Sequence, residues 1–309
     1  MAQGETFKPG EPYTHRLSKI LEEYPDGSQI IREILQNSDD AKSSSQVFIL
    51  DRPALLAKND TIFEERDFDS LKKLANSEKY DQFDKIGVMG VGFNSVYHIC
   101  DTVQLITGDN FLILDPHENY FDGGIKIDFV KNNLAALYPD QFAPFRVPCD
   151  QNFKGSLFRY PLRTAQDALE SEISKKAYSP DQILEMFKTF YENESINCLL
   201  FLKYIESIEF YELGENETEP KLLYSIEIVN PERIRAERRK IAESIGPMMN
   251  SLTKKKNSKI TALETAFIAE FRRKRGDDEP QVDQWIIFTW LDDLNAAENY
   301  FQNNFKKSI

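Results

Sequence analysis

Three polar side chains recur on one face of a predicted helix near the N-terminus. In the segment Arg32–Ala41, the residues Glu33, Asn37 and Asp40 are spaced i, i+4 and i+7, so they share a helical face. A carboxylate one turn before a carboxamide can accept a proton from water, while the amide oxygen can ligate a hard cation such as Mg²⁺. An ordinary amphipathic helix with a solvated polar face gives the same pattern, so this segment alone leaves both interpretations open.

A glycine-rich segment follows at Gly87–Ser95, with the form G-x-x-G-x-G and a predicted helix after it. Glycines let the backbone approach an anion, and a helix N-terminus presents unpaired N–H groups, so the segment could hold a phosphate. It lacks the Gly-Lys-Ser/Thr of a Walker A loop and the G-x-G-x-x-G order of a dinucleotide fold. A purely structural turn is the alternative.

The surrounding pattern predicts the elements that must position these residues. Apolar residues at helical spacing predict helices, and short or alternating apolar runs predict strands. The expected helices cover residues 14–24, 28–41, 64–75, 93–100, 179–191, 231–249 and 292–305. The expected strands cover residues 46–51, 54–57, 102–107, 110–115, 155–160, 198–204, 207–213, 221–229 and 284–291. Residues 260–273 fit either type, and the polar residues 76–85 are expected to form a loop.

Composition and charge exclude several classes of protein. The 309 residues carry 38 basic and 51 acidic side chains, and the net charge of −13 argues against general attraction to nucleic acid or to an anionic membrane. The three cysteines, Cys100, Cys149 and Cys198, have no paired spacing, which argues against a disulfide framework or a cysteine zinc site. No apolar run approaches the roughly 20 residues of a membrane-spanning helix, and no secretory signal is visible, so we expect a cytoplasmic protein.

Together, the order and spacing of the two segments resemble the GHKL ATPase superfamily, which includes the heat-shock-90 chaperones, the ATP-hydrolysing part of DNA gyrase, histidine kinases and MutL. The fuller similarity is to the sacsin-type heat-shock-90-like ATPase domain. It is carried by Leu21–Ile30, Glu33–Ala41, Pro53–Leu55, Gly87–Ile99, Leu114–His117 and Phe158–Arg163. The resemblance covers about residues 13–165 and continues weakly toward the C-terminus.

The resemblance implies a role for each matching residue. Glu33 would be the general base for the attacking water, Asn37 would hold Mg²⁺ beside the phosphates, and Asp40 would support the nucleotide site. Lys79 or Lys85, from a lid loop, would meet a phosphate. The remaining residues implied for lid closure and nucleotide binding are Gly87, Gly90, Gly92, Phe93, Asn59, Asp60 and Ser156.

Two positions depart from the family's pattern. The family reads adenine with an Asp in a D-x-G-x-G motif, whereas Asn59 stands at that position here, followed by Asp60 and no glycine. An Asn can still accept a hydrogen bond from the adenine amino group through its amide oxygen, although its NH₂ then needs another partner. The second departure is the immediate turn at Arg52-Pro53, where the family has a longer connection. The missing piece could be a surface loop, which folds tolerate, or its absence could leave one wall of the pocket open.

These observations predict an α/β (α+β) two-layer sandwich of the GHKL type, with a mixed sheet and helices on one face. We expect a flexible arm at residues 1–12, a nucleotide-binding domain at 13–165 and a smaller middle-domain-like α/β region at 166–309. The resemblance implies ATP, ADP and Mg²⁺ as ligands, slow ATP hydrolysis, and client proteins or co-chaperones as partners. The alternative is a catalytically inactive nucleotide-binding scaffold or interaction module, which the departures at Asn59 and at residue 52 favour. A relative acting on DNA or as a kinase is disfavoured by the net charge and by the lack of a histidine phosphoacceptor domain.

Overall fold

The computed structural model describes residues 11–23, 26–75, 92–214, 217–237, 239–240, 243 and 263–291. The chain divides into two compact units. Unit 1 comprises Met1–Ile226 and Lys274–Asp278, and unit 2 comprises Glu227–Arg273 and Glu279–Ile309. The units thus divide near residue 226, and the functional division expected near residue 165 stays a prediction.

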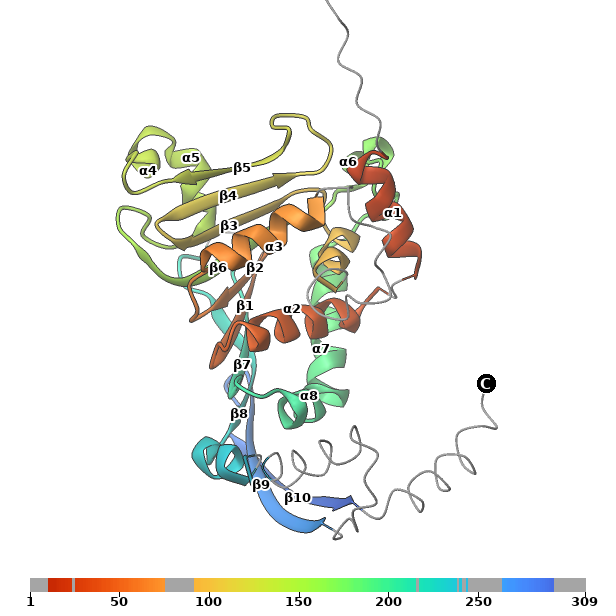
Figure 1. Cartoon of the computed structure of the whole chain (residues 1–309), viewed down its shortest axis with the longest axis vertical. Coiled ribbons are helices and arrows are strands. Elements are labelled where there is room, and N and C mark those ends of the chain that lie inside the picture. The colour runs from red at the N-terminus through yellow and green to blue at the C-terminus, as the bar shows by residue number, and fades with distance from the viewer. Residues whose placement is uncertain are drawn as a thin grey trace, which may run out of the picture. The chain divides into compact units, whose positions relative to one another are not determined.

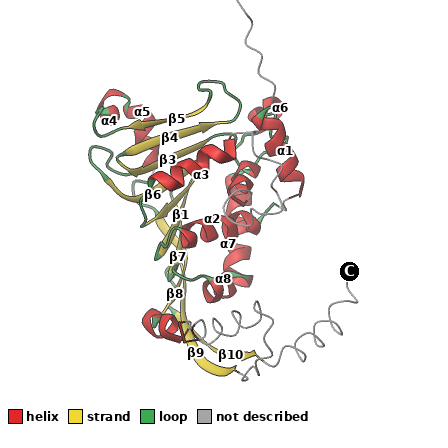
Figure 2. Cartoon of the chain, in the orientation of Figure 1, coloured by secondary structure: helices red, strands yellow, loops and turns green. Residues whose placement is uncertain are grey.

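Unit 1 contains both helices and strands, in short runs of each kind (Figures 1 and 2). Its helices are α1 (Tyr13–Glu23), α2 (Ser28–Asp40), α3 (Glu65–Ala75), α4 (Leu134–Leu137), α5 (Pro139–Phe142), α6 (Ala165–Glu170), α7 (Pro180–Asn193) and α8 (Ser195–Phe201), with the 3₁₀ helices η2 (Gly92–His98) and η3 (Ala143–Phe145). Its strands are β1 (Ser45–Asp51), β2 (Ala54–Asn59), β3 (Val103–Gly108), β4 (Asn110–Asp115), β5 (Gly123–Asp128), β6 (Phe153–Pro161), β7 (Ser207–Glu212) and the start of β8 (Lys221–Ile228).

The strands of unit 1 form an open mixed sheet in the order β8-β7-β1-β2-β6-β3-β4-β5. Strand β1 pairs in parallel with β7, whereas β1–β2, β2–β6, β3–β6, β3–β4 and β4–β5 are antiparallel. A two-residue turn joins β1 to β2, because Asp51 pairs directly with Ala54. The prediction of an α/β protein with a mixed sheet is therefore confirmed.

Side chains alternate across this sheet and build two apolar layers. Leu105 and Leu112 pack against Phe68 of α3, and Phe48 of β1 packs against Phe187 of α7 with ring centroids 4.9 Å apart. This face carries α2, α3 and α7 (Figure 1). The opposite face carries a second cluster, made of Leu56, Ile106, Phe111, Phe129, Phe142, Phe145, Cys149 and Leu157. The short helices α5 and η3 contribute Phe142 and Phe145 to it, so the expectation of helices on one face only is wrong for these segments, which bury their own aromatic side chains.

Two predicted elements differ in kind from those observed. The sequence pattern predicts a strand over residues 198–204, but α8 occupies Ser195–Phe201. A short apolar run does not distinguish strand from helix by its pattern. Here Ile196 and Leu199, three residues apart, are buried while Phe201 is exposed, which is helical periodicity. The helix expected at 93–100 is the 3₁₀ helix η2, which begins at Gly92.

Strand β9 (Leu263–Arg275), which lies in unit 2 up to Arg273, forms an antiparallel hairpin with β10 (Gln281–Leu291). The ambiguous segment 260–273 is therefore a strand over its described residues. Residues 231–237 are helical, which agrees with the predicted helix over its described start. The predicted helix at 292–305 and the predicted loop at 76–85 lie outside the described residues. Within the described part of the chain, no helix has the length and apolarity needed to cross a membrane.

Candidate functional site

Helix α2 turns one side toward the core and leaves Glu33 and Asn37 beside the candidate site. Ile30, Ile31, Ile34 and Leu35 are buried, which fixes the rotation of the helix about its axis. Glu33 and Asn37 then lie half-buried on the neighbouring side. The predicted helix is confirmed over this stretch.

The Glu33 carboxylate lies against the start of η2. Gln29, one turn earlier on α2, donates a hydrogen bond from Nε2 to Glu33 Oε1 at 2.6 Å. A Cβ on Gly92 would lie 2.8 Å from Glu33 Cδ and closer still to Oε2. Position 92 therefore requires a glycine, because any side chain there would displace the Glu33 carboxylate.

A cavity of about 660 Å³, including the part open to solvent, lies beside this contact. Three predicted site residues line it, namely Asn37, Asn59 and Phe93. The other lining residues, from α2, α3, β6 and the segment before α3, are Ile34, Ser38, Ala41, Phe63, Asp67, Ser70, Leu71, Phe158 and Tyr160. The cavity is mostly apolar with a few polar groups, which is the usual character of a small-molecule site.

Asn59 is held by a buried hydrogen-bond chain that the sequence did not reveal. Its Nδ2 donates to Ser38 Oγ at 3.0 Å, and Ser38 donates in turn to Gln46 Oε1 at 2.6 Å. The amide oxygen of Asn59 accepts the Thr61 backbone N–H at 3.0 Å. Ser38 thus supplies the partner that the NH₂ group of Asn59 requires.

Asp60 and Ser156 do not line this cavity. Each forms hydrogen bonds that hold backbone segments near it. Asp60 accepts hydrogen bonds from the hydroxyls of Ser43 and Ser44 and from the Ser44 N–H at 2.9 Å. Burial alone raises the pKa of the Asp60 carboxyl, but these hydrogen bonds outweigh it and hold the pKa below its usual value. Ser156 is fully buried and donates to the Thr61 carbonyl at 2.6 Å.

Asp40 lines a different hollow, between α2 and α8, with Arg32, Gln36, Glu194 and Asn197 among its neighbours. Burial, with the negative charge of Asp39 next to it, raises the pKa of the Asp40 carboxyl. The structure therefore does not bring Asp40 to the cavity that Asn37 and Asn59 share. The predicted residues Lys79, Lys85, Gly87 and Gly90 lie outside the described residues.

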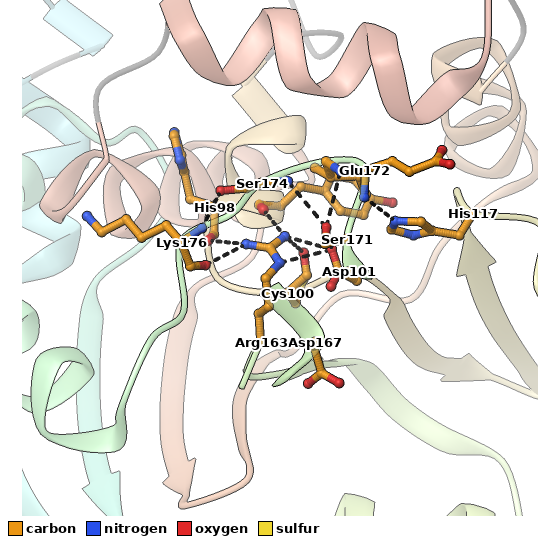
Figure 3. Close-up of polar contacts among 12 residues, drawn as sticks. His98, Cys100, Asp101, His117, Arg163, Asp167, Ser171, Glu172, Ser174 and Lys176 are labelled. Carbon is orange, nitrogen blue, oxygen red and sulfur yellow. Dashed lines mark hydrogen bonds and ion pairs between the residues drawn. The ribbon is translucent and has the colours of Figure 1, made fainter. Parts of the chain in front are cut away.

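Arg163 has a structural role that the sequence analysis did not assign to it (Figure 3). Its guanidinium is buried and donates to the carbonyls of Tyr97 at 2.7 Å, His98 at 2.8 Å and Cys100 at 2.7 Å. It also pairs with Asp101 Oδ1, at 3.0 Å from Nε and 2.8 Å from Nη2. Arg163 thereby satisfies carbonyl groups at the C-terminal end of η2, whose first residues are Gly92 and Phe93. The available signal was a cationic side chain three residues after the end of the predicted strand 155–160.

This geometry combines a carboxylate, a carboxamide and an apolar cavity in one place. Glu33 and Asn37 are one helical turn apart, and Gly92 brings the η2 backbone against the carboxylate. Such an arrangement could orient a water molecule with the carboxylate and a hard cation with the amide oxygen, beside a ligand whose apolar part fills the cavity.

Comparisons with known proteins identify the family of this chain. A family model described as "Sacsin domain" matches residues 10–225, which is nearly the whole first part of unit 1. The human protein Sacsin is 29% identical over 309 aligned residues, which cover 89% of this chain and 7% of that protein. The chain thus spans a small fraction of the length of that relative. Because the family model matches more than half of the sequence, this chain belongs to the sacsin-domain family.

Proposed function

We propose that this chain binds ATP and ADP with Mg²⁺ and hydrolyses ATP slowly, as a heat-shock-90-like module with a GHKL-type nucleotide fold. The observation that carries the proposal is the contact of Glu33 with Gly92 beside a cavity lined by Asn37 and Asn59. Four residues from three segments, α2, β2 and η2, thus lie close together, and the resemblance implies a role for each of them. Membership of the sacsin-domain family supports the same proposal.

The residues present fit a magnesium nucleotide. The Asn37 amide oxygen is a ligand type that Mg²⁺ accepts, and Glu33 is near enough on the helix to orient water beside it. Among the described residues, no group of three or more His, Cys, Asp or Glu could hold a metal ion. A magnesium ion that arrives with its nucleotide needs no such group, because it keeps several waters and binds substrate phosphates plus one or two protein oxygens. When bound, it would neutralise phosphate charge during hydrolysis.

Calorimetric titration of ATP and ADP, with and without Mg²⁺, tests the nucleotide site. We expect magnesium-dependent binding that Asn37→Ala weakens roughly tenfold or more. Gln36→Ala is the matched control, because Gln36 is the exposed neighbour on α2 and lines the other hollow. A folded chain that binds neither nucleotide would contradict the proposal.

A hydrolysis assay then separates an enzyme from a scaffold. If Glu33 is the general base, Glu33→Ala lowers the hydrolysis rate by roughly 10²- to 10⁴-fold while nucleotide binding persists. The scaffold is favoured by the neutral Asn59, which replaces the family's charged Asp. Tight nucleotide binding by the unaltered chain with no hydrolysis would support the scaffold instead.

We further propose client proteins or co-chaperones as partners, with neither nucleic acid nor a membrane surface, and a cytoplasmic location. The charge of −13 supports the exclusion of polyanionic partners. Co-precipitation of unfolded model clients with and without ATP tests the chaperone role. Equal binding of clients with and without ATP would contradict the chaperone role.

A further inference from the structure

The hairpin of β9 and β10 ends in a long strand that carries almost no charge. Strand β10 has 11 residues, and among the described strands it pairs with β9 alone, so its other edge has no strand partner in this part of the chain. The sequence Gln281–Leu291 contains no lysine, arginine, glycine or proline. Its one charged side chain, Asp283, forms an ion pair with Arg273 of β9 at 2.6 Å. Strand β10 therefore lacks the residues that usually keep a sheet edge from pairing with another strand.

Strand β5, which lies at an end of the sheet order in unit 1, is an edge of the opposite kind. It has 6 residues and begins with Gly123 and Gly124, whose φ values of 77° and 145° lie in the region that favours glycine. It also carries Lys126 and Asp128. Short length, glycine and charge are features that keep edges unpaired. The contrast indicates that the edge of β5 stays unpaired, whereas the edge of β10 accepts another strand.

Apolar side chains are exposed beside the edge of β10. Ile286 is 75% exposed and lies directly opposite Ile268 of β9, which is 41% exposed. Val282 lies on the same face of β10 as Ile286 and is 53% exposed. The other face of the hairpin differs, because Phe267 and Phe271 of β9 are buried there. One face of the hairpin thus presents an apolar surface that continues to the edge of β10.

We propose that β10 pairs antiparallel with β10 of a second copy of this chain, around a two-fold axis that passes beside Ile286. Ile286 is the middle residue of the strand, so this register pairs all 11 residues of each copy. Residues directly opposite each other in antiparallel strands lie on the same face. Ile268 and Ile286 of both copies therefore form one row of side chains across four strands. The row covers the side of Ile286 that the single chain leaves exposed.

The distribution of charge supports a second copy as the occupant of this edge. In the proposed register Asp283 lies opposite the uncharged Thr289, and the Asp283 residues of the two copies are roughly 20 Å apart along the strands. That separation exceeds the Debye length at physiological salt, so the two carboxylates repel each other little. The edge pairs best with a strand that is poor in charge and rich in β-branched and aromatic residues, and β10 itself meets both conditions.

Sedimentation equilibrium of the full chain over a wide range of concentrations tests the proposal. We expect a reversible equilibrium between monomer and dimer. Ile286→Lys should raise the dissociation constant of the dimer roughly tenfold or more, because it places two like charges opposite each other. Leu169→Lys is the matched control, since Leu169 is 72% exposed on α6 and the change in charge is the same. Circular dichroism verifies that both variants are folded.

Two results of this experiment would overturn the proposal. One is an unaltered chain that stays monomeric at every concentration. The other is a folded Ile286→Lys variant that dimerises as tightly as the unaltered chain, which would place the dimer contact elsewhere.

Cysteine cross-linking tests the register of the two strands. Ile286→Cys places two thiols opposite each other across the axis, whereas Gln284→Cys, on the same face of β10, places them roughly 14 Å apart. Both are made together with Cys198→Ser, because Cys100 and Cys149 are buried and Cys198 is not. Mild oxidation should give about tenfold more disulfide-linked dimer from Ile286→Cys than from Gln284→Cys. Equal yields at the two positions would indicate random collision and would overturn the register.

Salt dependence distinguishes pairing of these edges from association through ion pairs. Each copy carries a net charge of −13, so the two copies repel each other and salt screens this repulsion. The dissociation constant should therefore fall as NaCl rises from about 0.05 M to about 0.5 M. A dimer that dissociates as salt rises would be held by charged groups, and growth beyond a dimer would indicate open assembly in place of a two-fold pair. Either result would overturn the proposal.

Discussion

The two ends of the 3₁₀ helix η2 are held by different means. At its C-terminal end, the buried Arg163 guanidinium donates to the carbonyls of Tyr97, His98 and Cys100 and pairs with Asp101. At its N-terminal end, Gly92 meets the half-buried Glu33 carboxylate, which is the tip of a flexible side chain. One end is therefore fixed by buried hydrogen bonds, while the other meets a group that can adjust.

This difference predicts that substitutions at the C-terminal end of η2 lower the folding free energy, whereas substitutions at its N-terminal end lower the proposed hydrolysis rate. Removing a buried partner of many carbonyl groups leaves those groups without hydrogen bonds, which costs folding free energy. Displacing a carboxylate tip costs little stability, because the tip can move, but it misplaces the proposed general base. Substitutions at the two ends of η2 should thus give opposite profiles.

The largest effect is expected for Arg163→Ala. It leaves Asp101 and several carbonyls without their cation, and loss of one partner of a buried pair costs about 3–5 kcal/mol. Arg163→Lys keeps the charge but lacks the planar fork, so it should recover only part of this loss. Urea unfolding followed by circular dichroism measures both. A loss below about 1 kcal/mol for the alanine variant would remove the contrast between the two ends of η2.

Gly92→Ala probes the adjustable end. The added Cβ takes the position of Glu33 Oε2, so we expect the proposed ATP hydrolysis to fall by roughly 100-fold while unfolding free energy changes by less than about 1 kcal/mol. Steady-state hydrolysis and urea unfolding of the same preparation supply the two numbers. Ser95→Ala, in the same 3₁₀ helix, is the control that leaves Glu33 in place. Unfolding of the Gly92→Ala variant would show that this end is as fixed as the other.

Gln29→Ala tests the N-terminal end of η2 in a second way, because it removes a hydrogen bond to the Glu33 carboxylate without adding an atom beside it. The hydrogen bond of 2.6 Å from Gln29 limits the positions of Glu33. Its loss should lower the hydrolysis rate about fivefold, with ADP affinity unchanged, since a bond to a partly exposed carboxylate is worth about 1 kcal/mol. Rates under saturating ATP and calorimetric affinities separate the two effects. A change in affinity with no change in rate would assign Gln29 to binding instead.

The main elements of unit 1 could be predicted because their patterns are local. The apolar spacing of Ile30, Ile31, Ile34 and Leu35 identifies α2, and Gly108-Asp109 marks the turn between β3 and β4. Helix α8 could not be identified in this way, because a short apolar run lacks a distinguishing period. The family match to residues 10–225 extends well past the segments that carried the resemblance.

The site was only partly predictable, for a different physical reason. Glu33, Asn37 and Gly92 belong to two motifs with recognisable types and spacing. The partners that orient the site come from distant segments, such as Gln46 and Ser38 for Asn59, or Asp101 for Arg163. A single sequence contains no local signal for such pairs. Ser156 and Asp60 illustrate the converse, because residues expected at the ligand are used to hold the backbone.

The smallest effect is expected for Asp60, whose carboxylate accepts hydrogen bonds from Ser43 and Ser44 in the connection between α2 and β1. Hydrogen bonds from Ser43 and Ser44 outweigh burial and hold the pKa of this carboxyl below its usual value. A lowered folded-state pKa contributes stability that is present above the unfolded pKa and is lost as pH falls through the folded value. Because Asp60 is exposed, solvent screening limits this contribution to less than about 1 kcal/mol.

Asp60→Asn should therefore flatten the fall in stability below about pH 4, and should leave the slope near neutral pH unchanged. Urea unfolding between about pH 3 and pH 7 gives the profile, with the exposed Asp69→Asn on α3 as the control. Identical acid profiles for the Asp60→Asn variant and the unaltered chain would mean that these serines bind Asp60 equally well when it is protonated. The α2–β1 connection would then be held by hydrogen bonding without a contribution from charge, as the neutral chain of Gln46, Ser38 and Asn59 is.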